Sequence, residues 1–329
     1  MTSRRIFRDA QHQALFDAQG YVVVPFLDDA AVERLSHLVP EFCPPDIAAN
    51  CFDDSTYLSS YDSQRRAAIS EFVQTAMGPR LMELLSEMRV WTGTLLQRQP
   101  GAPALVPHQH LPSTADLPST GLVCWCPLFD CDEDGGALQV IPGSHKLLRH
   151  VMTSTSAPAW QRIAADLPDY LVTLKVKAGE AVLFSESIIH GSGPTQRRRP
   201  RVAMVSLALP VEATPALHVD SLAQPDHVEI YRVHDEFAHS DAARGVLSPH
   251  DVGDFLGAIP ANRVALNRRQ FEALLANASR VASGVDPYLA VADLADPPTP
   301  RAAPAHRRLR RFVSRHIPAR VKARLRALV

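Results

Sequence analysis

The sequence predicts a mainly β fold, a sandwich or barrel of short strands with helices at its flanks. Between residues 90 and 209, β-branched and aromatic runs recur, separated by turn signals such as Pro100-Gly101 and Pro142-Gly143. Strands and helices do not alternate regularly, which disfavours a doubly wound parallel sheet. Because 46% of the 329 residues are hydrophobic, the chain can bury one large core or two smaller ones.

Each element is expected from its local pattern. The start predicts a helix over 8–19, a strand over 21–26, a helix from Asp28 to about Val39, and a helical region over 64–88 interrupted at Gly78-Pro79. Residues 211–285 look polar and helical, and end in a helix within 262–283 that could dock on the sheet. The expected strands are 90–99, 121–129, 137–141, 170–176, 181–184, 187–190 and 201–209.

Composition excludes several classes of protein. No apolar run approaches the roughly 20 residues that cross a bilayer, and no apolar stretch follows the charged start. An odd number of cysteines, without a C-x-x-C pair, favours buried free thiols in a reducing compartment, so we expect a cytoplasmic protein. The five are Cys43, Cys51, Cys124, Cys126 and Cys131.

Charge is distributed unevenly along the chain. Nine of the 34 basic residues fall within 306–329, a segment without acids, so the remainder is acidic. Nothing in residues 1–300 offers a basic stripe or a recognition helix, and we expect no nucleic-acid partner. We expect one domain over 1–285, a Pro-rich linker over 286–305 and a basic amphipathic tail over 306–329. This tail either packs on the body or on a second subunit, or contacts anionic lipid or a lipid-linked substrate at the membrane periphery.

Two segments carry residues suited to chemistry. In Pro107-His108-Gln109-His110, the alternation of an extended chain puts both imidazoles on one side, where they could share a metal ion. The run from Gly179 to Pro194 predicts a strand pair ending in His190 beside a glycine-rich turn, and Arg201 follows at the head of another strand. Each feature taken alone is weak, since most histidines at strand ends are structural.

Together these segments resemble the phytanoyl-CoA dioxygenase family of Fe(II)/2-oxoglutarate oxygenases. The resemblance rests on Gly135-Gly-Ala-Leu-Gln-Val-Ile-Pro-Gly-Ser-His145, residues 179–184, His190-Gly-Ser-Gly-Pro194 and Arg201, and spans about residues 16–209. It implies a double-stranded β-helix, the cupin-like jelly roll. At one open end of that fold, a His-x-Asp/Glu pair and a distal histidine hold iron.

The resemblance also implies roles for individual residues. His108 matches the first metal ligand, His190 the distal one, and Arg201 the arginine that pairs with the C5 carboxylate of 2-oxoglutarate. A guanidinium fork reads a carboxylate bidentately, as lysine cannot. Ser192 matches a hydroxyl that supports this contact. Gln97 and Trp125 lie on strands expected to face the cosubstrate pocket.

The sequence departs from the family at His110, where the family has a carboxylate. Three neutral imidazoles offset none of the charge of Fe(II), whereas two histidines and a carboxylate offset one unit. His110 is a third ligand, or it swings away in favour of water, an anion, Asp116 or Glu186, or the site has lost its iron chemistry. An imidazole fills the space that a halide would need, which disfavours halogenation.

The function expected is that of a non-haem iron and 2-oxoglutarate-dependent oxygenase, which hydroxylates an unactivated C–H of a small molecule or biosynthetic intermediate. Its catalytic set would be His108, His110, His190 and Arg201. Two alternatives stay open: a non-catalytic jelly-roll binding protein, and a three-histidine metal oxygenase that does not use 2-oxoglutarate. A homo-oligomer is compatible with each of them.

Overall fold

The computed structural model describes residues 4–42, 55–56, 63–116, 121–146, 153, 156–234, 253–261 and 263–276. The chain divides into two compact units, residues 1–293 and 294–329, and every described residue belongs to the first. Residues 286–329, which hold the expected linker and basic tail, lie outside the described residues, and so do Cys43 and Cys51. The predictions made for them remain predictions.

Three antiparallel sheets and four α-helices make up the described part. The helices are α1 (Ala10–Gln19), α2 (Asp29–Phe42), α3 (Ser63–Leu84) and α4 (Arg268–Ala276). In spatial order, the large sheet contains β1 (Tyr21–Pro25), β8 (Glu180–Ser185), β5 (Leu122–Pro127), β10 (Arg201–Pro210), β3 (Met88–Arg98) and β2 (Ser55–Thr56). The small sheet contains β4 (Leu105–His108), β9 (His190–Ser192), β6 (Leu138–Val140) and β7 (Val172–Thr173). The third sheet contains β11 (Ala216–Asp220), β12 (His227–Arg232) and β13 (Asp254–Pro260).

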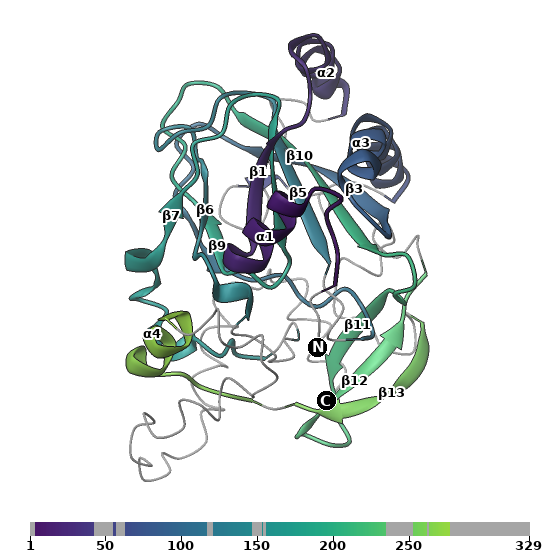
Figure 1. Ribbon diagram of the computed structural model, residues 1–329, viewed down its shortest axis with the longest axis vertical. Coiled ribbons are helices and arrows are strands. Elements are labelled where there is room, and N and C mark those ends of the chain that lie inside the picture. The colour runs from purple at the N-terminus through teal and green to yellow at the C-terminus, as the bar shows by residue number, and fades with distance from the viewer. Residues whose placement is uncertain are drawn as a thin grey trace, which may run out of the picture. The chain divides into compact units, whose positions relative to one another are not determined.

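The order in which the chain visits the first two sheets defines a jelly roll. It runs from β3 in the large sheet to β4 in the small one, then to β5, β6, β8, β9 and β10, changing sheets at each of these steps. Figure 1 shows β6, β7 and β9 grouped on one side of β1, β5 and β10. The predicted double-stranded β-helix with flanking helices is thus confirmed.

Alternation along the strands of the large sheet builds two cores. The outer core lies under α3, where Ile69, Val73, Met77 and Leu81 recur every four residues and pack with Leu122 and Cys124 of β5. The inner core lies between the two sheets and includes Val123, Trp125, Val182, Phe184 and Ala203. Cys124, Cys126 and Cys131 are buried free thiols, as expected. Odd-numbered residues at the start of β10 therefore point into the space between the sheets.

Three expectations for secondary structure are wrong. The strand expected over 187–190 is mostly a turn, and β9 begins only at His190. Helix α3 continues through Gly78-Pro79, because the packing of its apolar face on the sheet outweighs the local breaking signal. Among the described residues of the region 211–285, the third sheet precedes α4, so this part is not mainly helical. In β12 the side chains of Val228 and Ile230 are buried, while those of His227 and Glu229 are partly exposed, an alternation that the polar composition concealed.

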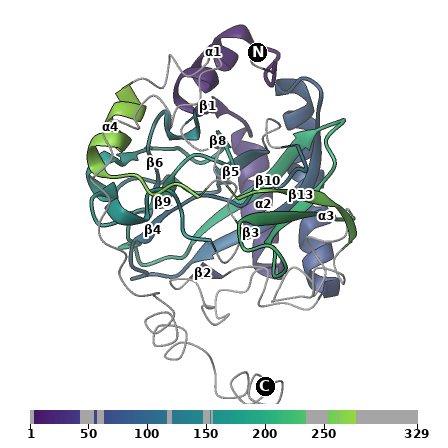
Figure 2. The same cartoon turned by 90° about the horizontal axis from the view of Figure 1, so that it is seen from below.

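Helix α4 is the last helix that the structure describes. Helix α4 lies beside the small sheet (Figure 2), and the Phe271 ring meets the Tyr170 ring edge-on at 5.3 Å between centroids. The expected helix is thus present over Arg268–Ala276, and this ring contact joins it to the short 3-10 helix Leu167–Tyr170 that precedes β7. Within the described residues, no helix combines the length and apolar character needed to span a membrane.

Helix α3 offers a matched test of the outer core. Met77 is completely buried, whereas Met82 on the same helix is 37% exposed. Met77→Ala should lower the free energy of unfolding by about 2–5 kcal/mol, because it removes buried methylene groups and leaves a cavity. Met82→Ala should change it by less than about 0.5 kcal/mol. Chemical denaturation measures both, and equal losses would contradict this packing.

Candidate metal centre

The segment His108-Gln109-His110 is held in place by its middle residue. The Gln109 side chain is 7% exposed, and its amide donates to the carbonyl of Ser187. The amide oxygen of Gln109 accepts a hydrogen bond of 3.0 Å from the indole N–H of Trp160. Since alternate residues of an extended chain face opposite sides, these bonds direct the two flanking imidazoles to the other side. The predicted common side for the two histidines is thereby explained.

His190 enters the site through strand pairing. It is the first residue of β9 and lies directly across from His108 of β4. The ring centroids are 4.3 Å apart for His108 and His190, 4.7 Å for His110 and His190, and 5.9 Å for His108 and His110. One ring nitrogen from each histidine lies within 4.8 Å of the other two. The structure thus brings together the three predicted histidines: His108 from β4, His110 from the segment after β4, and His190 from β9.

Backbone carbonyls set the tautomers of two of these histidines. The Nδ1 atom of His108 lies 3.0 Å from the carbonyl oxygen of Val106, and Nδ1 of His190 lies 3.0 Å from that of Ile188. A carbonyl oxygen can only accept, so each Nδ1 carries the hydrogen. Each Nε2 is then the unprotonated nitrogen, as in metal-binding histidines, whose second nitrogen is oriented in this way.

Burial keeps the imidazoles of His110 and His190 neutral. Burial, assisted by the nearby His108, lowers the pKa of His110 to about 3. Burial also holds the pKa of His190 well below its usual value. The Phe184 ring, with centroid distances of 5.0 Å to His190 and 6.2 Å to His110, supplies an apolar wall. Phe184 was missed as a site residue, although its inward place on the expected strand 181–184 could have indicated it.

Neither carboxylate weighed as a substitute for His110 joins the cluster. Asp116 is exposed. Glu186 is buried, but its Oε1 accepts from the backbone N–H groups of Gly121 at 3.0 Å and Ser113 at 3.4 Å. Its main-chain carbonyl accepts from the N–H of His110 at 3.0 Å. Burial raises the pKa of the Glu186 carboxyl. Among the described residues, the three histidines are the one group of ligand side chains close enough to share an ion.

The predicted cosubstrate residues do not all come together. Arg201, 4% exposed, begins β10 on the inner face, and its Cζ lies 5.4 Å from the centroid of the Trp125 ring. Ser192, two residues after His190, is buried. Gln97 pairs with Val202, a residue of the outer core, and therefore faces away from the space between the sheets. Its neighbour Arg98, which sequence reasoning missed, faces inward and pairs with Arg201.

The donor set fits an Fe(II) ion. Three imidazoles converge, and in two of them a backbone carbonyl leaves Nε2 unprotonated; nitrogen donors of this kind suit iron. An indole N–H, on Trp125, is buried beside Arg201 and has no hydrogen-bond partner within the described part of the chain. A buried donor next to a guanidinium suits an acidic ligand such as a carboxylate.

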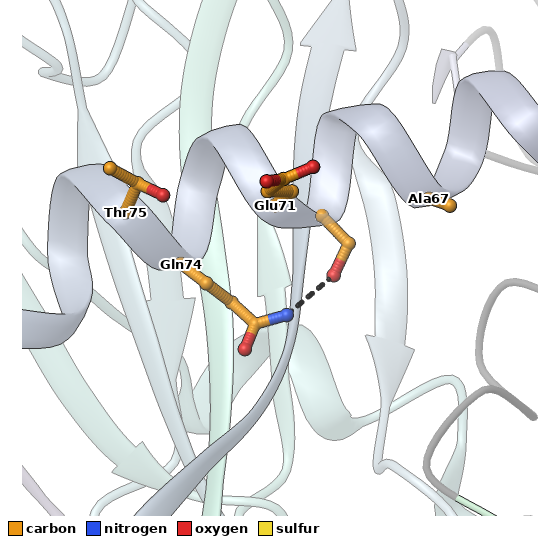
Figure 3. A pocket seen from close by; sticks show the side chains of 5 residues that line it. Ala67, Glu71, Gln74 and Thr75 are labelled. Atoms are coloured by element: carbon orange, nitrogen blue, oxygen red, sulfur yellow. Dashed lines mark hydrogen bonds between the residues drawn. The ribbon is translucent and has the colours of Figure 1, made fainter.

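A hollow of about 390 Å³ lies along α3, and none of the three histidines lines it. It is lined by Ala67, Ser70, Glu71, Gln74 and Thr75, and the amide of Gln74 donates to the Ser70 hydroxyl at 3.0 Å (Figure 3). That hydroxyl also accepts from the N–H of Gly93 at 3.0 Å. The polar groups that line the hollow thus connect α3 to β3.

A model of the family "Phytanoyl-CoA dioxygenase (PhyH)" matches residues 16–203, more than half of the chain. The chain therefore belongs to the phytanoyl-CoA dioxygenase family, and the resemblance seen in the sequence is confirmed.

The individual proteins that this chain resembles share about a third of its residues or fewer over the matched part. "Dioxygenase trt7" of Aspergillus terreus is 31% identical over 129 residues, which cover 37% of this chain and 41% of that protein. Among solved structures, the non-heme alpha ketoglutarate dependent carbocyclase SnoK from nogalamycin biosynthesis is 21% identical with a TM-score of 0.46, covering 63% of this chain and 86% of its own. HygX from Streptomyces hygroscopicus, with nickel, 2-oxoglutarate and hygromycin B bound, is 16% identical with a TM-score of 0.45. The match covers 62% of this chain and 88% of the HygX chain.

Gly191 offers a test of how the centre is assembled. A Cβ atom at this position would lie 2.6 Å from the carbonyl oxygen of Leu105 in β4, so Gly191→Ala should push β4 away from β9 and separate His108 from His190. We expect metal affinity to fall by on the order of tenfold or more. Gly78→Ala, where a Cβ meets no atom within 4 Å, is the control. Metal titration measures both, and an unchanged affinity in Gly191→Ala would show that the close strand contact is not required.

Proposed function

We propose that this protein is an Fe(II)- and 2-oxoglutarate-dependent oxygenase that hydroxylates an unactivated C–H bond of a small molecule or biosynthetic intermediate. The observation that carries the proposal is the convergence of His108, His110 and His190. Membership of the phytanoyl-CoA dioxygenase family supports it. Fold alone would not be sufficient, because one fold hosts many functions.

The three histidines would hold Fe(II) through one nitrogen each. Their tautomers and orientations are prepared by the carbonyls of Val106 and Ile188 and by the bonds of Gln109. Such preparation lowers the cost of ordering the ligands when the ion binds. Bound Fe(II) supplies the capacity to activate O2 with oxidative decarboxylation of 2-oxoglutarate, and so to oxidise a C–H bond of the substrate.

Three residues would bind the far carboxylate of 2-oxoglutarate. Arg201 offers a buried guanidinium, the indole N–H of Trp125 lies beside it, and Ser192 offers a hydroxyl from the strand of His190. Since Ser192 follows His190 by two residues, the cosubstrate would reach from the metal toward the large sheet. Phe184, packed against two of the imidazoles, would keep water away from the reacting atoms.

Bound 2-oxoglutarate would also offset part of the positive charge of Fe(II). Imidazole ligands leave both positive charges of Fe(II) uncompensated, whereas a carboxylate ligand would offset one. The carboxylate of 2-oxoglutarate next to its oxo group would supply part of that compensation, while Arg201 balances the far carboxylate, so metal and cosubstrate should strengthen each other's binding. The neutral His110 is also the observation that favours the second candidate, a three-histidine metal oxygenase in which Arg201 binds a carboxylate of the substrate itself.

One experiment separates these candidates. The protein is reconstituted anaerobically with Fe(II) and 2-oxoglutarate, its metal content is measured, and succinate is followed after oxygen is admitted with candidate small molecules. Bound iron with substrate-dependent succinate supports the proposal. Bound iron that oxidises a substrate without forming succinate favours the second candidate. Absence of bound iron in the folded protein would overturn both and leave a non-catalytic binding protein.

Variants at position 110 test the third ligand. His110→Ala should weaken Fe(II) binding by at least about tenfold, because one coordinate bond is lost. His110→Asp should keep or improve binding, because it restores the two-histidine, one-carboxylate set that Fe(II) favours. His12→Ala, a partly exposed histidine of α1, is the control and should bind iron like the parent. Equal iron affinity in His110→Ala and the parent would show that His110 is not a ligand.

A further inference from the structure

Arg98 is a completely buried arginine outside the predicted set. It is the last residue of β3 and lies directly across from Arg201 of β10. Cross-strand partners share one face of a sheet, so both side chains leave the large sheet toward the small one. Two like charges placed opposite each other repel, and this repulsion is stronger in a buried site than in water. An anion held near both guanidinium groups would offset it.

The contacts of Arg98 lead to the strand of the distal histidine. One amino group donates to the Ser192 hydroxyl oxygen and also lies 3.4 Å from the carbonyl oxygen of Gly193. The other amino group donates to the carbonyl of Pro103. Arg98 therefore connects the end of β3 with the segment that precedes β4 and with the residues that follow His190.

The contact with Ser192 determines what its hydroxyl can do. A hydroxyl has one proton to donate, and an arginine can only donate. Because Arg98 donates to the oxygen of Ser192, the proton of this hydroxyl is left for another acceptor. Within the described residues, this bond from Arg98 is the one hydrogen bond of the Ser192 side chain. A buried hydroxyl in this state is prepared to donate to an incoming carboxylate.

We propose that Arg98 is a positioning residue for the cosubstrate: it orients the Ser192 O–H toward the carboxylate that Arg201 binds, and adds a second positive charge beside that carboxylate. This inference rests on the proposed function, since it concerns the same pocket. It makes the pocket selective for 2-oxo acids with a second, far carboxylate. A purely structural role for Arg98, through Pro103 and Gly193, would produce no such selectivity.

Binding of two ligands distinguishes these roles without any turnover. The protein is loaded with Mn(II), and the affinities for 2-oxoglutarate and for pyruvate are measured by calorimetry; pyruvate has the 2-oxo acid end but lacks the far carboxylate. Arg98→Met should weaken 2-oxoglutarate binding by about tenfold or more, because a charged partner is lost. Its pyruvate and Mn(II) affinities should stay within about twofold of the parent's. Arg89→Met, near the other end of β3, is the matched control and should change neither.

A double-mutant cycle tests whether Arg98 acts through Ser192. Ser192→Ala should also weaken 2-oxoglutarate binding selectively, and Arg98→Met in that background should cost clearly less than it does alone. Independent, multiplying effects would overturn the positioning role. Equal losses for 2-oxoglutarate and pyruvate in Arg98→Met would likewise overturn it in favour of a structural role.

Folding and the underlying proposal are checked in the same series. Melting temperatures show whether Arg98→Met folds; if it does not, Arg98→Lys, which keeps the charge but not the fork, replaces it and should give an intermediate selective loss. A parent that binds Mn(II) but does not prefer 2-oxoglutarate to pyruvate would refute the cosubstrate pocket itself. A parent with this preference and an unaffected Arg98→Met would refute the role of Arg98 alone.

Discussion

The pairing of β4 with β9 is the constraint on which the centre depends. It sets His108 opposite His190, and the side-chain alternation after β4 then directs His110 to the same side. The close contact between Leu105 and Gly191 and the two bonds of Gln109 keep this arrangement in place. Because β9 also carries Ser192, the same strand links the proposed metal ligands to the arginines of the large sheet. Small movements of these short strands would therefore change metal and cosubstrate binding together.

The side chains of the site carry positive charge and no negative charge. The imidazoles of His108, His110 and His190 bring no negative charge, while Arg98 and Arg201 bring two positive charges to neighbouring positions of the large sheet. A site of this kind binds a cation best when a dianion is present, and a dianion best when the cation is present. Under the proposed function, 2-oxoglutarate is a reactant and also stabilises the bound metal ion through its negative charge. The replacement of the family's carboxylate by His110 increases this dependence.

Sequence reasoning reached the fold and the histidines because both depend on local patterns. The two-residue spacing in His108-Gln109-His110 determines a shared side in any extended chain, and the strands between 90 and 209 were separated by clear turns. It failed where the outcome depended on register. Gln97 and Arg98 are neighbours, and only the pairing of β3 with β10 shows that Arg98 faces the site and Gln97 the outer core. A shift of one residue reverses the faces of a strand. The strands β11, β12 and β13 were missed because their partly exposed surfaces give them a polar composition.

The most direct test of this account is a crystal structure of the protein grown anaerobically with Fe(II). We expect one ion bound by a nitrogen of His108, His110 and His190 at about 2.0–2.2 Å, with the remaining positions open to small ligands. Anomalous scattering at the iron edge would identify the ion. An ion held by His108 and His190 while the His110 ring lies more than about 3 Å away, beyond a metal–nitrogen bond, would contradict the three-histidine centre.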